Sequence, residues 1–222
     1  MNWKLVGCAL LAVAVTACTV PRRPAMHAPL PGGAPTSVEG LAAAIEAVSE
    51  RSDHESDGRI RGQLADEASG YANACLAMAP QTAACLYGDG LALGLQARAH
   101  PTRAGELLKS MLDSLSRAEA ADPDYDEAGP ARVRALVLIR APGWPLGPGD
   151  ADEGLVAARR AVASRPQYPP NLLALAEALS KTGDASGARE TYARARAAAE
   201  ALPPATADRG RWLREADEGS KR

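Results

Sequence analysis

Side chains that could act as general bases or nucleophiles are sparse in this 222-residue chain. Its three histidines, His27, His54 and His100, lie far apart, and no Ser-His-Asp or Cys-His arrangement can be assembled around them. The segment SDHESDGRI at 52–60 places acidic residues at the first, third and fifth positions of an EF-hand-like loop. Leu64 stands at the twelfth position, where a calcium loop needs a bidentate carboxylate. The sequence therefore predicts a protein that is not an enzyme and that holds no metal or cofactor.

Two cysteines are candidates for a disulfide bond. Cys75 and Cys85 lie on either side of Pro80, at the end of one predicted helix and the start of the next. Such positions can approach each other across an antiparallel connection, and an exported protein meets oxidising conditions. The alternative is a pair of small buried residues, because Cys75 occupies a position that is Ala in the other units of the chain.

The segment LYGDGLALG at 86–94 places three glycines inside a predicted helix. Each glycine costs a helix about 1 kcal/mol relative to alanine, so the segment needs a compensating contact. That contact is either a closely packed neighbouring helix or a ligand. Tyr87 and Asp89, which stand beside the glycines, are candidate ligand or partner contacts.

A second unusual segment, YDEAGPARVRALVLIRAPGWPLGPGD at 125–150, interrupts an alanine-rich chain with glycines and prolines. Its prolines stop the predicted helix 129–140 and leave a stiff insert before the next helix. Trp144 in this insert either packs into the core or contacts a ligand or partner. The candidate contacts in this segment are Tyr125, Asp126, Arg132 and Trp144.

The N-terminus predicts export and lipidation. Residues 1–17 have a positive start and an apolar run that is too short to span a bilayer, as in a secretory signal peptide. The sequence Val-Thr-Ala-Cys that ends at Cys18 resembles a bacterial lipobox, in which this cysteine is acylated and becomes the new N-terminus. Thr19 in place of Asp implies sorting to the periplasmic face of the outer membrane. The alternative is a soluble secreted protein in which Cys18 is incidental.

The composition separates a tether from a folded domain. Residues 18–36 carry five prolines after the lipidated cysteine and predict a disordered tether with a mean reach of about 23 Å. Residues 37–222 form the predicted domain. The chain has no Phe and 4% aromatic residues, so Ala and Leu must fill its core, which favours closely packed helices. A net charge of −2 gives no indication of nucleic-acid binding.

Internal spacing indicates a repeat. Pro80, Pro123 and Pro166 recur at intervals of 43, and Gly-Asp-Ala at 149–151 recurs 34 residues later, which is the tetratricopeptide period. We therefore predict an all-α, tetratricopeptide-like superhelix of about four helical hairpins and a C-terminal capping helix. The predicted helices are 38–51, 59–79, 82–98, 102–121, 129–140, 150–164, 169–182, 185–199 and 206–217.

Residues 75–199 resemble the T-component family of TRAP transporters, which are periplasmic lipoproteins with tetratricopeptide-like helices. The resemblance is strongest between residues 125 and 150. It rests on Tyr125-Asp126, Gly129-Pro130, Arg132, Ala141-Pro142-Gly143, Pro145, Gly149-Asp150, Pro166-Gln167-Tyr168 and Asn171.

The resemblance implies a lipid-anchored adaptor that binds a periplasmic solute-binding protein. It also implies a cavity or pore through the helical stack for a small apolar ligand. The alternative function is a lipoprotein scaffold for envelope or cell-wall assembly without small-molecule binding. The sequence leaves open whether the protein forms homo-oligomers.

Overall fold

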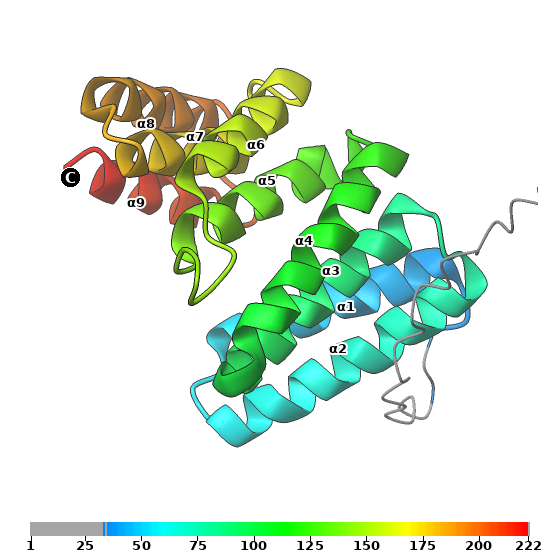
Figure 1. The fold of residues 1–222 in the computed structure, drawn as a ribbon. Coiled ribbons are helices and arrows are strands. Elements are labelled where there is room, and N and C mark those ends of the chain that lie inside the picture. The colour runs from blue at the N-terminus through cyan, green and yellow to red at the C-terminus, as the bar shows by residue number, and fades with distance from the viewer. Residues whose placement is uncertain (1–32, 34, 222) are drawn as a thin grey trace, which may run out of the picture.

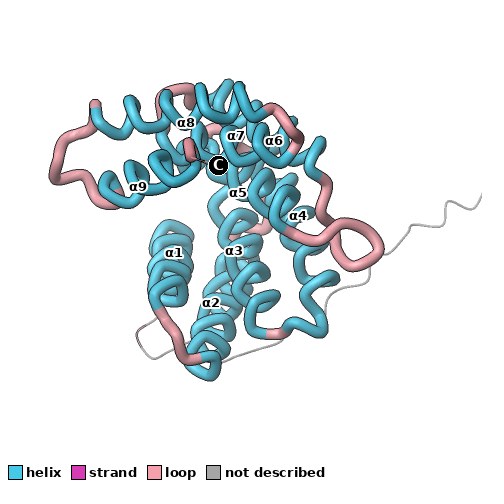
Figure 2. Tube along the Cα trace, turned by 90° about the vertical axis from the view of Figure 1, so that its left-hand side faces the viewer, coloured by secondary structure: helices cyan, strands magenta, loops and turns pink. Residues whose placement is uncertain are grey.

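The computed structural model describes residues 33 and 35–221 and shows an all-α protein. The predicted signal peptide, Cys18 and most of the tether lie outside the described residues. Throughout the described part, helices are joined by loops and no strand is present (Figure 2). None of the helices in residues 35–221 has the length and hydropathy needed to cross a bilayer.

The helices follow the predicted order closely. The last helix begins at Arg209, three residues later than predicted, and the fifth begins earlier than predicted with an unusual turn described below. The nine α-helices of the described chain are α1 (Val38–His54), α2 (Gly58–Met78), α3 (Ala83–Ala99), α4 (Ala104–Ala121), α5 (Tyr125–Arg140), α6 (Ala151–Ser164), α7 (Pro169–Lys181), α8 (Ala185–Glu200) and α9 (Arg209–Gly219).

Short polar side chains fix the starts of α1, α2, α6 and α8, where they satisfy the first free backbone N–H groups. Ser37 Oγ accepts a hydrogen bond from Gly40 N at 3.1 Å. Asp150 and Asp184 act in the same way at the starts of α6 and α8. The Gly-Asp-Ala repeat noted in the sequence is therefore a repeated helix start, with Gly183 adopting a positive φ of 89° just before it.

The helices form antiparallel hairpins that stack into a superhelix (Figure 1). Neighbours in sequence pack together, and α1 also packs on α3 and α5 on α7, so the first helices of successive hairpins lie side by side (Figures 1 and 2). This is the arrangement of a repeat protein, in which each unit contacts its neighbours. Helices α1–α4 form one group, here called the N-terminal half, and α5–α9 form the C-terminal half (Figure 1). Helix α9 covers α7 and α8 at the end of the stack, as predicted for a cap.

Small residues allow the helices to approach one another. Gly88 faces Ile45 of α1, and a Cβ at this position would lie 2.7 Å from the Ile45 side chain. A Cβ at Gly90 would lie 2.9 Å from Leu115 of α4. These two glycines therefore serve close helix packing on opposite sides of α3.

A disulfide bond joins the first two hairpins. Cys75 near the end of α2 is bonded to Cys85 near the start of α3, with their Cα atoms 5.2 Å apart. Both residues are fully buried in the core of the N-terminal half. The bond closes a short loop around Pro80 and fixes the corner between the two helices.

Replacing both cysteines by alanine should lower the free energy of unfolding by about 2–3 kcal/mol, because the unfolded chain loses a constraint on a loop of this length. For a domain of this size the melting temperature should fall by roughly 5–10 °C. Thermal unfolding followed by circular dichroism measures the change. A reductant should lower the melting temperature of the wild type and leave that of the Cys75→Ala/Cys85→Ala variant unchanged. Equal effects on both proteins would contradict the assignment.

Candidate functional site

The structure brings some of the predicted contact residues together and separates others. Tyr87, Tyr125, Asp126 and Arg132 meet where α5 leaves the N-terminal half. Asp89 lies apart from them and accepts a hydrogen bond from Ser114 Oγ of α4. Trp144 lies on the loop after α5 and is 89% exposed, so it does not fill the core.

Helix α5 begins with a left-handed turn. Asp126, Glu127 and Ala128 have φ angles of 48°, 54° and 63°, and the right-handed helix starts at Gly129. Each non-glycine residue in this conformation costs roughly 1–2 kcal/mol. Pro130 then occupies the first right-handed turn, where its missing N–H removes no helical hydrogen bond. The predicted start at 129 thus holds for the right-handed helix, and the turn before it was not predicted.

Arg132 stabilises the left-handed turn from inside the protein. Its Nη1 donates to the carbonyl oxygens of Asp126 and Glu127 at 3.2 and 3.1 Å, and its Nη2 donates to Asp126 Oδ2 at 2.7 Å. The residue is 9% exposed, so these charge-assisted bonds form in a poorly solvated environment. They offset the backbone strain of the turn.

Asn171 holds the same turn from the C-terminal half. This fully buried residue of α7 accepts a hydrogen bond from Arg132 Nη1 at 3.1 Å and donates through Nδ2 to the Glu127 carbonyl at 3.0 Å. Tyr168, at the start of α7, places its ring 5.3 Å from the Arg132 guanidinium, within cation–π range. In the sequence analysis Asn171 entered only through the family resemblance. A polar residue near a helix start is common, so the sequence alone did not indicate that Asn171 is buried in this joint.

Tyr87 connects the turn to the N-terminal half. Its hydroxyl donates to Asp126 Oδ2 at 2.9 Å, and its ring packs edge-to-face on Tyr125 at 5.5 Å. A Cβ on Gly129 would overlap Asp126 and lie 3.0 Å from the Tyr87 hydroxyl, so only glycine fits there. Burial, followed by the Asp126 charge, raises the pKa of Tyr87, and burial followed by Glu46 raises the pKa of Tyr125 to about 12.

These contacts define a structural joint, which we call the Arg132 joint: Tyr87, Asp126, Gly129, Arg132 and Asn171. Its polar groups bond to one another and to the backbone across α3, α5 and α7. The arrangement fixes the direction in which α5 leaves the N-terminal half. These mutual hydrogen bonds stabilise the fold. Within the described residues, no cluster of His, Cys, Asp or Glu side chains is arranged to hold a metal ion.

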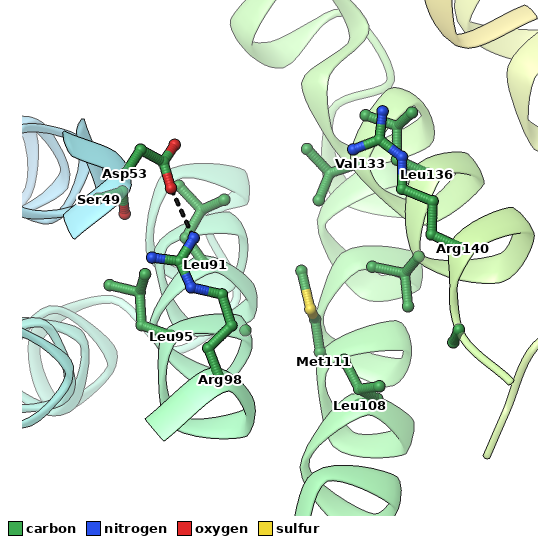
Figure 3. Close-up of a pocket in the computed structure, with 13 residues that line it drawn as sticks. Ser49, Asp53, Leu91, Leu95, Arg98, Leu108, Met111, Val133, Leu136 and Arg140 are labelled. Atoms are coloured by element: carbon green, nitrogen blue, oxygen red, sulfur yellow. Dashed lines mark hydrogen bonds and ion pairs between the residues drawn. The ribbon is translucent and has the colours of Figure 1, made fainter. Parts of the chain in front are cut away.

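An apolar cleft of about 420 Å³ opens between the two halves (Figure 3). Residues of α1 and α3 line one wall, and residues of α4 and α5 line the other (Figure 3). Aliphatic side chains and one methionine line most of it: Leu91, Leu95, Leu108, Met111, Val133, Leu136 and Val137.

Two arginines stand at the rim of this cleft on opposite walls (Figure 3). Arg98 forms an ion pair with Asp53 at 2.6 Å, and Arg140 binds Glu177 of α7 through two hydrogen bonds of 2.8 and 2.6 Å. Each arginine is therefore held in place by a carboxylate. None of the six predicted contact residues lines the cleft. Ala141, the first residue of the loop that carries Trp144, does line it.

The resemblance implied a cavity through the stack, but the residue pattern did not identify the residues that line the cleft, because they look like ordinary core residues. Leu91 and Leu95, and likewise Val133 and Val137, are spaced as on any buried helix face. In the structure Leu91, Val133 and Val137 are only partly buried. The spacing gives no sign of whether a neighbouring helix covers such a face.

Replacing Arg132 by alanine should lower the free energy of unfolding by about 3 kcal/mol or more, because it removes the charged donor to Asp126 and to the left-handed turn from a nearly buried site. Chemical denaturation measures the loss. The control is Arg51→Ala, which removes an exposed ion pair with Glu67 at 3.5 Å and should cost less than about 1 kcal/mol. Similar small losses in both variants would show that Arg132 does not hold the joint.

The Tyr125 hydroxyl should make stability depend on alkaline pH. Its folded-state pKa of about 12 exceeds the ordinary value of 10, so the unfolded chain loses this proton first as pH rises. The contribution is present below pH 10 and is lost as pH rises from 10 towards 12. Urea denaturation between pH 9 and 12 should show a steeper decline for the wild type than for Tyr125→Phe. Parallel curves for the two proteins would argue against this environment for Tyr125.

Comparison with known proteins supports the repeat architecture. Residues 146–212 match the model of the tetratricopeptide repeat family, which covers α6, α7, α8 and the start of α9. No curated protein matches the chain. The match and the stacked hairpins together identify a tetratricopeptide-like protein with an all-α superhelical fold. Repeats of this kind are generally non-enzymatic and bind other proteins on extended concave surfaces.

Proposed function

We propose that this protein is a lipid-anchored periplasmic adaptor that binds a partner protein and holds a small apolar ligand in the cleft between its two halves. The main support for this proposal is the apolar cleft. Its volume of about 420 Å³ lies within the usual range for small-molecule sites. A non-catalytic role agrees with the tetratricopeptide-like fold.

The lining of the cleft favours an aliphatic ligand. Leu91, Leu108, Val133, Leu136 and Val137 are only partly buried, so each leaves apolar surface in contact with water. Covering such surface contributes roughly 25 cal/mol per Å². Met111 of α4 lines the cleft (Figure 3), and its flexible side chain can adapt its shape to the occupant. Arg98 and Arg140, each paired with a carboxylate, form the polar end of the site at its rim.

The partner follows from the resemblance of residues 75–199 to the T-component family. We propose a solute-binding protein of a TRAP-type transport system as the partner, with the adaptor placed on the periplasmic face of the outer membrane by acylation of Cys18. Genomic neighbourhood and co-purification test this part of the proposal. Recovery of envelope-assembly factors alone, with no solute-binding protein, would favour the scaffold function instead.

Ligand binding can be tested with fluorescent apolar probes. The wild type should bind cis-parinaric acid at one site with micromolar affinity, and Leu91→Gln and Val137→Gln should each weaken binding about tenfold by placing an amide in the cleft. Both residues are partly exposed, so the fold should tolerate the changes.

The matched control for these variants is Val156→Gln. Val156 is 47% exposed on α6 and does not line the cleft, so its replacement should leave the affinity unchanged. Circular dichroism establishes that all three variants remain folded. No saturable binding by the wild type, or equal binding by cleft variants and control, would exclude the cleft as the ligand site.

A further inference from the structure

The loop between α5 and α6 exposes apolar side chains to water. Trp144 is 89% exposed and Leu146 is 80% exposed, the two highest values among the large hydrophobic residues of the described chain. The loop sequence APGWPLGPG, residues 141–149, contains no charged residue. In Figure 1 the loop projects from the fold between the ends of α5 and α6. We call it the Trp144 loop.

The backbone of the Trp144 loop is well fixed. Leu146 N donates to the Gly143 carbonyl at 3.0 Å, and Gly149 N donates to the Pro142 carbonyl at 2.9 Å. A Cβ on Gly149 would overlap the Ala141 carbonyl, so the two ends of the loop lie in direct contact. Three prolines restrict the remaining backbone angles. The fold therefore holds Trp144 and Leu146 outward.

We propose that Trp144 and Leu146 insert into the interfacial region of a lipid bilayer. Tryptophan favours this region because its ring is apolar and its N–H can bond to water or headgroups. A stable protein interface needs roughly 800 Å² from each partner, contributed by about 20–30 residues. The uncharged part of the loop is only nine residues long and is bounded by Arg140 and Asp150. A bilayer contact needs no such extended surface.

This inference rests on the lipid anchor of the proposed function. The segment from Cys18 to Ser37 can span about 65 Å when extended. Helix α1 is 17 residues and therefore about 25 Å long, and Asp53 near its end lines the same cleft as Ala141 at the base of the loop. The tether is thus long enough for the acylated cysteine and the Trp144 loop to contact one membrane. Tethering also raises the effective concentration of the loop at the bilayer, so a weak contact suffices.

Bilayer contact also has a consequence for the cleft. Ala141 belongs to both the loop and the cleft lining, so insertion of Trp144 brings the cleft close to the membrane surface. An apolar ligand dissolved in the bilayer then has a short path to the aliphatic walls. The loop would orient the adaptor as well as hold it.

Tryptophan fluorescence offers a direct test. The chain has three tryptophans, and the processed protein, which begins at residue 18, retains Trp144 and Trp212. Trp212 is 7% exposed and serves as an internal control for folding. The probe is vesicles of phosphatidylethanolamine and phosphatidylglycerol with brominated acyl chains. In acylated protein, the exposed emission of Trp144 should shift to the blue and be quenched by bromine, while that of Trp212 should not change.

A second measurement separates the loop from the anchor. Processed protein carrying Cys18→Ser should still partition onto these vesicles, and Trp144→Ala should lower its partition coefficient about tenfold. The matched control, Val156→Ala, should have no effect, because Val156 lies on α6 outside the loop. Both substituted positions are exposed, so neither change should disturb the fold.

The outcomes distinguish failure of the loop from failure of the anchor. Acylated protein that stays on vesicles while Trp144 remains unquenched would overturn the loop inference and leave the anchor intact. If the protein purified from cells carries no acyl chain and its Trp144 still inserts into the vesicles, the membrane contact of the loop is supported and the lipid anchor at Cys18 is refuted. Protection of Trp144 from iodide by a purified solute-binding protein, without quenching by brominated lipid, would identify a protein contact and overturn the bilayer proposal.

Discussion

The hydrogen bonds of the Arg132 guanidinium connect the left-handed start of α5 to α7. It lies in a nearly buried site and bonds to two backbone carbonyls, one carboxylate and one amide oxygen. Through these bonds it stabilises three consecutive left-handed residues, a conformation that L-residues disfavour. Tyr87 and Asn171 add contacts from α3 and α7. The joint contributes to the orientation of the two halves, together with the packing of α4 on α5 and the ion pairs of Glu119 with Arg134 and Arg160.

The cleft depends on this orientation. Val133, the first of its lining residues on α5, follows Arg132 directly, and Leu136, Val137 and Arg140 continue along the same helix. The opposite wall comes from α1 and α3, and α4 lies on the same side as α5 (Figure 3). A change in the direction of α5 would therefore move these four residues together and alter the volume of the cleft. The joint and the cleft differ in chemistry. The polar groups of the joint form hydrogen bonds with one another, whereas the cleft is lined by aliphatic side chains that are partly exposed to water.

Much of the fold could be predicted from the sequence because its signals are local. The proline and glycine spacing located the hairpins, and the glycines near Asp89 indicated close helix packing, which the Ile45 and Leu115 contacts explain. The left-handed turn could not be predicted, because Asp-Glu-Ala has no intrinsic preference for it and its stability comes from the distant Asn171 and Tyr87. The residues that line the cleft could not be predicted either, because Leu91 and Val133 have the spacing of core residues. Arg132 was predicted as a ligand or partner contact, and in the structure its guanidinium bonds to Asp126, Glu127 and Asn171 within the joint.

We infer that the Arg132 joint helps to set the separation of the cleft walls. The most direct measurement is the distance between spin labels at Glu50 on α1 and Glu190 on α8, which are both exposed, in the wild-type background and in Arg132→Met. The account predicts a narrow distance distribution with Arg132 and a broadened or shifted one without it, while circular dichroism shows the helices intact. The same narrow distribution in both proteins would show that the two halves hold their orientation independently of this arginine.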